Sequence, residues 1–334
     1  MNRYRIAVTS ALIAIGLAGW ISHSSAAAET VKLRYGVIAN SARSISSLPL
    51  YVAQRQGFLA REGIELELVP LPGVEHMVNA VENGQVDVTH TATPYLIQAV
   101  VGKNYNTVAV IGGAANTVYS LIAQPGIKSF ADLKGKTIGV SLPADTITIS
   151  TKMLLAKHGL TEGAFTTTEL VGTPVRSKCL TDGACAAVPL GQPEDILFEQ
   201  KGYTKLGDST EVIPELQFNV LAVRRDWAAS HKDSVVHLAR AFADAFRFMA
   251  DPKNREALVK IMAETTNATA DVAGPILAFY YDPYRGVMPK AAEINMAGMT
   301  KVIELLGQSG ELAKPLPPAS RFVDLTYLKA AGVE

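Results

Sequence analysis

The stretch IELELVPLPGVEHMVNAVENGQVDVTHTATP, residues 64–94, decides the fold class. Its beginning alternates apolar and acidic side chains, which predicts a strand over 64–69. A helix is expected over 76–82, and Asn83-Gly84 follows it as a C-cap that tolerates a left-handed backbone. Residues 86–89 then form a second buried strand. Strands and helices in this order are typical of an α/β fold with largely parallel sheets.

The same alternation continues on both sides of this stretch. Thr93 is expected as the N-cap of the next helix, with Pro94 at its first helical position. Further strands are predicted over residues 31–37, 108–111, 120–123, 137–140, 185–188 and 218–223. Further helices are predicted over residues 49–63, 146–158, 176–181, 235–249, 256–264, 271–280 and 291–309. The chain is therefore expected to become mostly helical after the last of these strands.

A weak internal echo connects two parts of the chain. Asn83-Gly84-Gln85-Val86-Asp87-Val88 is followed by Pro94, and Asp182-Gly183-Ala184-Cys185-Ala186-Ala187 is followed by Pro193 at the same offset. Each unit reads as the end of a helix, a glycine stop, a buried strand and a polar loop before the proline. Together with the repeated order of strands and helices, the echo indicates two similar lobes.

Composition and the first residues bound the class of protein. Of the 334 residues, 48% are apolar and 19% are charged, which is a globular balance. Arg3 and Arg5 precede an apolar run over 6–21 and the small residues 24–28, the pattern of a cleaved signal peptide over residues 1–28. The alternative is a membrane anchor, but a run of about 16 residues is shorter than the roughly 20 that a spanning helix needs. We therefore expect export to the periplasm.

The charge and the cysteines of the exported chain limit its partners. Removal of Arg3 and Arg5 leaves 29 basic against 31 acidic side chains, a net charge of −2, so no basic footprint for a nucleic acid remains. An oxidising compartment permits a disulfide between Cys179 and Cys185. Two small buried side chains without a bond are the alternative. No metal site is expected, because no histidine or third cysteine lies near this pair in the sequence.

Three motifs resemble those of one family of transport proteins. Residues 48–64, LPLYVAQRQGFLAREGI, are similar to its first helix and the turn after it. Residues 82–88, ENGQVDV, resemble its glycine turn and strand, and residues 129–140, SFADLKGKTIGV, resemble the start of its second lobe. The family is the nitrate, sulfonate, taurine and thiamine-precursor (NMT1-like) type of ABC-importer substrate-binding protein. The resemblance covers roughly residues 31–250, with a departure at Ala186, where the family often has aspartate.

The resemblance implies a periplasmic binding protein of type II, with two lobes of mostly parallel sheets, a hinge and a cleft. The first lobe would hold residues 29–118 and 222–334, and the second would hold residues 119–221. The crossings would lie near Thr117–Ser120 and Phe218–Ala222. The chain would be a monomer without cofactor that binds a small molecule and delivers it to an ABC permease with its ATPase.

Most candidate binding residues lie on loops at the carboxyl ends of predicted strands, where ligands sit in open α/β sheets. Asn116 and Tyr119 are candidates because they lie near the first expected crossing. Free N–H groups and the helix dipole favour an anion at the helix starts that follow. The expected ligand is therefore a small organic anion such as a sulfonate or a carboxylate. The candidates are Asn40, Arg43, Ser46, Thr91, Thr93, Asn116, Tyr119, Ser141, Asp145, Thr146 and Gln192.

Two of the charged candidates have alternative roles. Arg43 would form a two-pronged contact with a carboxylate or sulfonate, or it would be a solvent-exposed loop residue. Asp145 would cap the helix that begins at Thr146, or it would face the cleft, where it repels an anion and favours an amine. The sequence leaves both alternatives open.

Two other classes of function are considered. A pyrimidine-precursor synthase has the same fold, but that enzyme type uses a cysteine cluster and active-site histidines; here His76 and His90 are expected in solvated or structural roles. No Gly-x-Ser-x-Gly or His-Glu-x-x-His motif is present, and no catalytic residue is proposed. The remaining class is a binding module of a tripartite transporter or of a sensor.

Overall fold

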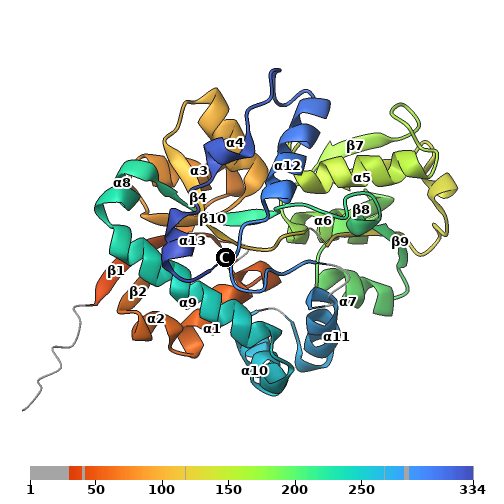
Figure 1. Cartoon of the computed structure of the whole chain (residues 1–334). Helices are drawn as coiled ribbons and strands as arrows, with labels where there is room; N and C mark the ends of the chain where they lie inside the picture. The colour runs from red at the N-terminus through yellow and green to blue at the C-terminus, as the bar shows by residue number, and fades with distance from the viewer. Residues whose placement is uncertain (1–29, 40–41, 117, 267, 282–285, 334) are drawn as a thin grey trace, which may run out of the picture.

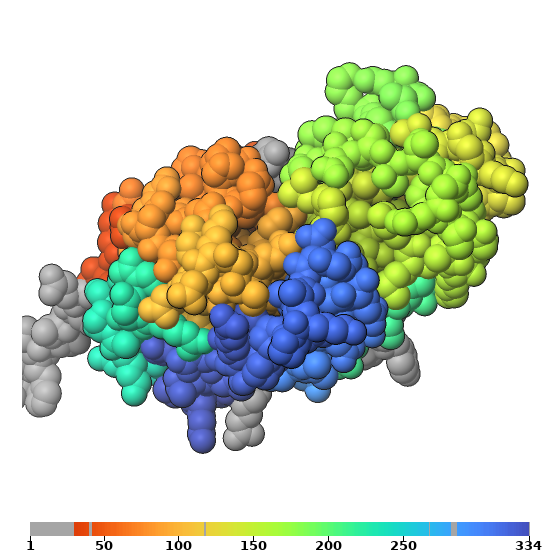
Figure 2. All heavy atoms as spheres, turned by 90° about the horizontal axis from the view of Figure 1, so that it is seen from above, coloured from red at the N-terminus to blue at the C-terminus, as the bar shows by residue number. Residues whose placement is uncertain are grey.

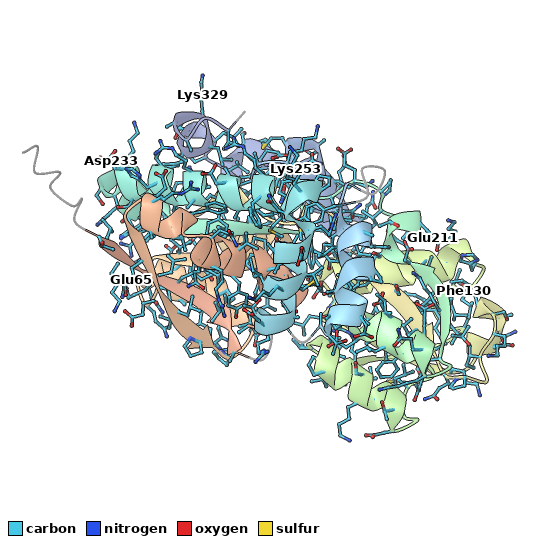
Figure 3. All side chains as sticks on the ribbon, turned by 90° about the horizontal axis from the view of Figure 1, so that it is seen from below. Glu65, Phe130, Glu211, Asp233, Lys253 and Lys329 are labelled. Atoms are coloured by element: carbon cyan, nitrogen blue, oxygen red, sulfur yellow. A yellow bond between two sulfur atoms is a disulfide. The ribbon has the colours of Figure 1, made fainter. Side chains whose placement is uncertain are left out.

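The computed structural model describes residues 30–39, 42–116, 118–266, 268–281 and 286–333. Within these ranges the chain forms two five-stranded sheets flanked by helices, which make up two lobes (Figure 1). Figure 3 shows Glu65 of one lobe and Phe130 of the other at opposite ends of the molecule. The predicted signal peptide over residues 1–28 lies outside the described residues.

The first sheet has the strand order β2-β1-β3-β10-β4. Its strands are β1 Val31–Ile38, β2 Ile64–Leu71, β3 Val88–Ala92, β4 Thr107–Gly112 and β10 Asn219–Arg224. β1 pairs in parallel with β2 and β3, whereas β10 runs antiparallel to both of its neighbours. Four strands therefore point one way and β10 points the other way.

The second sheet repeats this arrangement with the order β7-β6-β8-β5-β9. Its strands are β5 Ser120–Ala123, β6 Thr137–Val140, β7 Thr166–Glu169, β8 Ala187–Leu190 and β9 Thr204–Asp208. β6 is parallel to β7 and β8, and β5 is antiparallel to β8 and β9. The reversed strand of each sheet is the first strand after the chain crosses from the other sheet. The predicted two-lobed α/β fold is confirmed, with one reversed strand in each mixed sheet.

Each α-helix before β10 lies, in the sequence, between strands of one sheet. The helices among the first strands are α1 Leu48–Arg55, α2 Phe58–Arg61, α3 Val74–Glu82 and α4 Thr93–Gly102. Those among the strands of the second sheet are α5 Thr146–Lys157, α6 Thr173–Thr181 and α7 Glu194–Gln200. Short 3₁₀ helices cover Ile45–Ser47, Phe130–Leu133, Ser209–Glu211, Pro252–Asn254 and Ala319–Phe322.

The C-terminal helices return to the first lobe. They are α8 Arg225–Ser230, α9 Lys232–Ala250, α10 Arg255–Thr265, α11 Ala270–Tyr280, α12 Met296–Gln308 and α13 Thr326–Ala330. α9 packs against α1 and α2, α12 against α4, and α13 against α9. The predicted apolar stripe of α9, which includes Val235, Phe242 and Met249, is buried. Within the described ranges, every helix is too short or too polar to span a lipid bilayer.

The internal echo of the sequence corresponds to equivalent places in the two sheets. Gly84 follows α3 with a φ of 72°, and Gly183 follows α6 with a φ of 76°. This left-handed conformation ends a helix without the steric cost that a side chain would add. The next strands, β3 and β8, occupy the third position of their sheets. The two units therefore have the same fold.

The second sheet separates two apolar clusters. Leu121 of β5 and Ala187 of β8 contribute to one cluster, and the adjacent residues Ile122 and Val188 contribute to the other. Successive side chains of a strand point to opposite faces of the sheet, which explains the division. Helices of the second lobe therefore pack on both faces of its sheet.

A disulfide joins Cys179 in α6 to Cys185, which precedes β8. Their Cα atoms are 5.3 Å apart, within the range that a disulfide needs. Cys185 is fully buried and belongs to the cluster that contains Leu180 and Val188. Of the two alternatives left open by the sequence, the structure has the bonded pair.

Replacing both Cys179 and Cys185 by alanine is expected to lower the free energy of unfolding by about 2 kcal/mol, because the disulfide restricts the unfolded chain around a short loop. Urea-induced unfolding followed by circular dichroism measures the change. Dithiothreitol should destabilise the wild-type protein to a similar extent and leave the double variant unaffected. Equal stability of the oxidised protein and the double variant would contradict this expectation.

Candidate functional site

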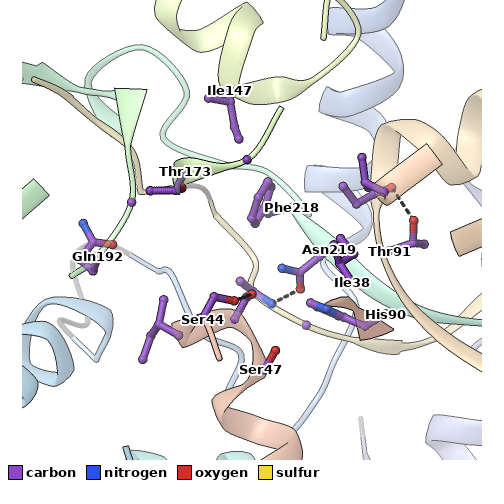
Figure 4. Close-up of a pocket in the computed structure, with 18 of the residues that line it drawn as sticks. Ile38, Ser44, Ser47, His90, Thr91, Ile147, Thr173, Gln192, Phe218 and Asn219 are labelled. Carbon is purple, nitrogen blue, oxygen red and sulfur yellow. Dashed lines mark hydrogen bonds between the residues drawn. The ribbon is translucent and has the colours of Figure 1, made fainter. Parts of the chain in front are cut away.

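A cavity of about 250 Å³ lies between the two lobes. Its lining includes the last residues of β3 and the segments that follow β1, β6 and β8 at the carboxyl ends of these strands. Figure 2 shows the lobes as two adjacent masses. In Figure 4, His90 and Thr91 of the first lobe lie opposite Thr173 and Gln192 of the second. The cavity is therefore built from the strand-end loops in which the sequence places the candidate residues.

Most of the predicted site residues line this cavity. They are Arg43, Ser46, Thr91, Asn116, Tyr119, Ser141, Asp145 and Gln192. Asn116 and Tyr119 lie on the segment that leads from β4 to β5, where Asn116 Nδ2 donates to the Pro214 carbonyl at 2.8 Å. Asn40 lies outside the described residues.

Thr93 and Thr146 do not line the cavity. Each is the first residue of its helix, α4 or α5, and each is buried, with no partner for its hydroxyl among the described residues. The expectation that Thr93 caps α4 is wrong, because the helix begins one residue earlier and Ala92 is its N-cap. The hydroxyl of Thr93 therefore turns into the protein instead of meeting the helix N-terminus.

Asp145 both caps a helix and lines the cavity. Its Oδ1 accepts a hydrogen bond from the Ile147 N–H at 3.0 Å at the start of α5, and its Oδ2 accepts one from Ser141 Oγ at 2.8 Å. Burial raises the pKa of this carboxyl above its ordinary value of 3.8, and the two hydrogen bonds oppose that shift. The predicted cap is present and uses one carboxylate oxygen, and the hydrogen bond from Ser141 uses the other.

Arg43 is an exposed residue at the edge of the cavity. Its guanidinium donates to the Thr266 carbonyl at 3.2 Å, just beyond the end of α10. This contact links the loop after β1 to the C-terminal helices. Because water screens an exposed cation, its attraction for a bound anion is weaker than that of a buried one.

Arg176 on α6 is a charged residue of the cavity that the sequence did not predict. It is 1% exposed. Its Nε donates to the Pro189 carbonyl at 2.8 Å, and its two terminal nitrogens donate to the Leu170 carbonyl at 3.1 Å and to Thr173 Oγ1 at 3.3 Å. These three bonds fix the guanidinium between α6 and β8.

No carboxylate in the described part of the chain forms an ion pair with Arg176. The guanidinium lies 5.7 Å from the centre of the Tyr119 ring, and Asp145 and Glu194 act on it only at longer range. Burial lowers the pKa of Arg176 below its ordinary value, but a guanidinium stays charged in proteins. Buried charges are normally paired, so among the described residues this side of the cavity carries a positive charge without a direct carboxylate partner.

Glu194, the first residue of α7, is a partly buried acid in the same lining. Burial raises the pKa of its carboxyl above the ordinary 4.5, while a hydrogen bond from its own backbone N–H opposes the shift. Nearby Asp195 raises this pKa further and Arg176 lowers it. The protonation state of Glu194 therefore changes the net charge that the cavity presents.

His90 of the first lobe and the residues at the two crossings contribute an uncharged polar pair and aromatic rings. Burial lowers the pKa of His90, although a hydrogen bond with Asn219 opposes this shift. The Asn219 Oδ1 accepts from the Ala114 N–H at 2.8 Å, which holds the amide in place. Phe218 contacts Tyr119 edge-on, with ring centres 6.2 Å apart, and its ring stands inside the cavity in Figure 4. His90 and the crossing residues thus offer apolar and neutral surface.

The described residues contain no group of three or more His, Cys, Asp and Glu side chains arranged to hold a metal ion. What the cavity provides is a buried cation, hydrogen-bonding groups and aromatic walls. This combination suits the binding of a compact solute with a polar and an apolar part.

The family model described as NMT1/THI5 like matches residues 44–255, which is more than half of the chain. The chain belongs to this family. The matched range contains most of the residues that line the cavity, including Ser44 in the loop after β1 and Asn219 at the start of β10.

Known proteins similar to this NMT1/THI5-like chain are distant in sequence. A curated relative, the bicarbonate transport ATP-binding protein CmpC of Synechocystis sp., is 23% identical over 255 residues, which are 70% of this chain and 38% of that protein. The chain therefore spans well under half the length of this relative.

Two solved structures share the fold. One is the ligand-binding component of an ABC-type import system from Staphylococcus aureus with zinc bound, with 19% identity, a TM-score of 0.73, and coverage of 91% of this chain and 99% of that one. The other is the alkanesulfonate-binding protein SsuA from Xanthomonas axonopodis pv. citri bound to MOPS, with 20% identity, a TM-score of 0.67, and coverage of 90% and 100%. Both neighbours are named as binding proteins.

In this NMT1/THI5-like protein, Asp145→Ala is expected to be less stable than Asp145→Asn by about 1 kcal/mol, because only asparagine still accepts the hydrogen bond that caps α5. Urea-induced unfolding at pH 7 measures the difference. If the two variants are equally stable, the cap contributes nothing.

The raised pKa of Asp145 also predicts that the stability of the wild-type protein relative to Asp145→Asn depends on pH. Because the folded pKa of Asp145 is raised, the carboxyl favours folding most at pH values below its ordinary 3.8, and this contribution is lost as the pH rises through the raised value. The stability of the wild-type protein relative to Asp145→Asn should therefore fall as the pH rises from 3.8 through the raised pKa. A constant difference over that range would argue against the raised pKa.

Proposed function

We propose that this protein is the solute-binding component of an ABC importer and that it captures a small organic anion, a carboxylate or a sulfonate, between its lobes. The observation that carries the proposal is the buried guanidinium of Arg176, which lines the cavity and forms no ion pair with a carboxylate among the described residues. Leaving a charge buried and unpaired is costly. An anionic ligand supplies the missing partner.

The arrangement of Arg176 suits an acid group. Three of the five N–H donors of a guanidinium are used by the protein, and two are left for a ligand. Hydrogen bonds between a guanidinium and a carboxylate or sulfonate are charge-assisted and are stronger than neutral ones. Because the Arg176 side chain is fixed before the ligand arrives, little entropy is lost on binding.

The size and walls of the cavity support a small ligand with an apolar part. A cavity of about 250 Å³ lies below the roughly 300–1,000 Å³ of sites for drug-sized molecules. Phe218, Tyr119 and Tyr280 line it together with the polar groups. A short aliphatic or a single-ring acid fits this mixture.

Ligand capture involves both lobes in this proposal. The first lobe comprises residues 29–118 and 222–334 and the second residues 119–221, with hinges at the two crossings. The start of the β10 strand at Asn219 in the first sheet supports a return crossing near Phe218. Contacts from both lobes exist together only when the cleft is closed, so the ligand favours closure.

The proposal includes the cellular setting. Residues 1–28 direct export to the periplasm, where the chain acts as a monomer without cofactor. It delivers its solute unchanged to a permease and its ATPase. The basic start, apolar run and small residues of the first segment support export, and membership of the NMT1/THI5-like family and the disulfide are consistent with it.

A thermal-shift screen of the protein against carboxylates, sulfonates, amines and neutral heterocycles tests the ligand class. Organic anions are expected to raise the melting temperature, because a ligand at large excess over its Kd stabilises the folded state by a few kcal/mol, about 2.7 at 100 times Kd. Recovery of the bound anion unchanged after incubation tests for turnover. A rise in melting temperature only with cations or with neutral heterocycles would contradict the anion proposal.

Substitution of Arg176 tests the observation that carries the proposal. Arg176→Met is expected to weaken binding of the best anion roughly 10- to 100-fold, because a charged hydrogen bond contributes about 1.5–3 kcal/mol. Lys178→Met, an exposed position on the same helix, is the matched control and should change Kd little. Arg43→Ala should have a small effect; unchanged affinity removes Arg43 from the site. Isothermal titration calorimetry gives each Kd.

The raised pKa of Glu194 predicts how anion binding depends on pH. As the pH rises through its raised pKa, the carboxyl becomes negative and repels an anionic ligand, so the Kd of wild-type protein should increase above pH 4.5. Glu194→Gln should bind more tightly at pH 7 and lose this part of the dependence. Glu199→Gln, an exposed position on the same helix, should keep the wild-type profile. A profile unchanged in Glu194→Gln would exclude Glu194 from the effect.

A further inference from the structure

Gln192 is a buried polar side chain that lines the cavity. The proposed contact between Arg176 and an anion gives it no role. Gln192 lies in the loop between β8 and α7 and is 5% exposed. Its Nε2 donates a hydrogen bond to Asp195 Oδ2 at 2.7 Å. In Figure 4 the amide nitrogen of Gln192 points away from the residues of the first lobe, and the amide oxygen points toward them.

Asp195 fixes this orientation of the amide. The carboxylate is buried, and it accepts hydrogen bonds from the Ile196 N–H at 2.8 Å and from Ser120 Oγ at 2.8 Å. A carboxylate in such a position accepts and does not donate, so it requires the NH₂ end of Gln192. A flipped amide would set two acceptors against each other in a buried place.

The oxygen of Gln192 is left as an acceptor without a donor. Gln192 Oε1 is buried, and no donor among the described residues forms a hydrogen bond with it. Buried polar groups without a partner are rare in proteins and are found where a ligand or water completes the bond. This oxygen belongs to a residue that lines the cavity, so the missing donor can come from a bound solute.

We infer that the solute is an organic anion that also carries an O–H or N–H donor, and that Gln192 Oε1 accepts from this donor while Arg176 holds the acid group. The inference rests on the proposed function and adds the substrate class: hydroxy- or amino-substituted carboxylates and sulfonates. A site with a fixed acceptor rejects the analogue that lacks the donor, because that complex leaves the acceptor buried and unpaired.

Matched pairs of probes test the inference on the wild-type protein. The pairs are 2-hydroxyethanesulfonate with ethanesulfonate, 2-hydroxypropionate with propionate, and 3-hydroxybenzoate with benzoate, and 2-aminoethanesulfonate tests an ammonium donor. In the best-binding pair the donor-bearing member is expected to have a Kd at least about tenfold lower, as the usual cost of an unsatisfied buried acceptor implies. Calorimetry or thermal shift gives the ratio.

Gln192→Met separates the acceptor from the shape of the side chain, since methionine has a similar length and no amide oxygen. The ratio of Kd values within the best pair should fall to about one, and the affinity for the member without the donor should stay within about threefold of wild type. Gln124→Met makes the same change in the second lobe outside the cavity, where Nε2 donates to the Leu180 and Cys185 carbonyls. It should keep the wild-type ratio.

The outcomes distinguish this inference from the proposed function. If none of the carboxylates or sulfonates binds, the proposed function fails and the inference with it. If they bind but the members of every pair bind equally, the anion proposal stands and the donor inference is overturned. The donor inference is also overturned if the preference survives in Gln192→Met. The wild-type ratio decides the matter even if Gln192→Met does not fold.

Discussion

Two segments of chain cross between the lobes, and hydrogen bonds tie them to each other. The Gly113 N–H donates to the Asn219 carbonyl at 3.0 Å, and the Ser209 N–H donates to the Tyr119 carbonyl at 3.0 Å. A side chain at Gly113 would collide with Asn219, so the close approach requires glycine there. Because the crossings are joined, the carboxyl ends of both sets of parallel strands face one gap. The cavity and every contact inside it depend on this arrangement.

Some polar groups around the gap use all of their hydrogen bonds within the protein, and others keep a donor or an acceptor for a ligand. Asp145 caps α5 with one oxygen and accepts from Ser141 with the other, and the Asn219 oxygen is held by a backbone N–H. Arg176 and Gln192 are also fixed by the protein, yet each keeps binding capacity, positive donors on one and a neutral acceptor on the other. Recognition therefore needs little rearrangement of the second lobe.

Most of the fold follows from local patterns, and what is missed has a physical reason. Apolar periodicity with glycine and proline punctuation predicts the central strands and the helices. β7 and β9 were not predicted; they are the two edges of the second sheet, and β7, Thr-Thr-Thr-Glu, has no fully buried residue. An edge strand exposed to water needs no apolar pattern. Strand-end loops likewise predict six of the lining residues, and the expected crossing predicts Asn116 and Tyr119. The side-chain directions of Thr93 and Thr146 depend on the exact start of each helix.

Sequence analysis does not identify Arg176 as a site residue, because α6 reverses the usual rule that apolar side chains are buried and charged ones are exposed. In α6 the apolar Val175 is 44% exposed, while its neighbour Arg176 is 1% exposed. An interpretation by hydrophobicity assigns the arginine to solvent and the valine to the core, and local sequence contains nothing that corrects this. Only the packing of α6 against β8 reveals that the carbonyls of Pro189 and Leu170 receive the guanidinium. Reversals of this kind oppose stability and are expected where a binding site requires them. The inverted pair on α6 is thus itself an argument that the charge serves a ligand.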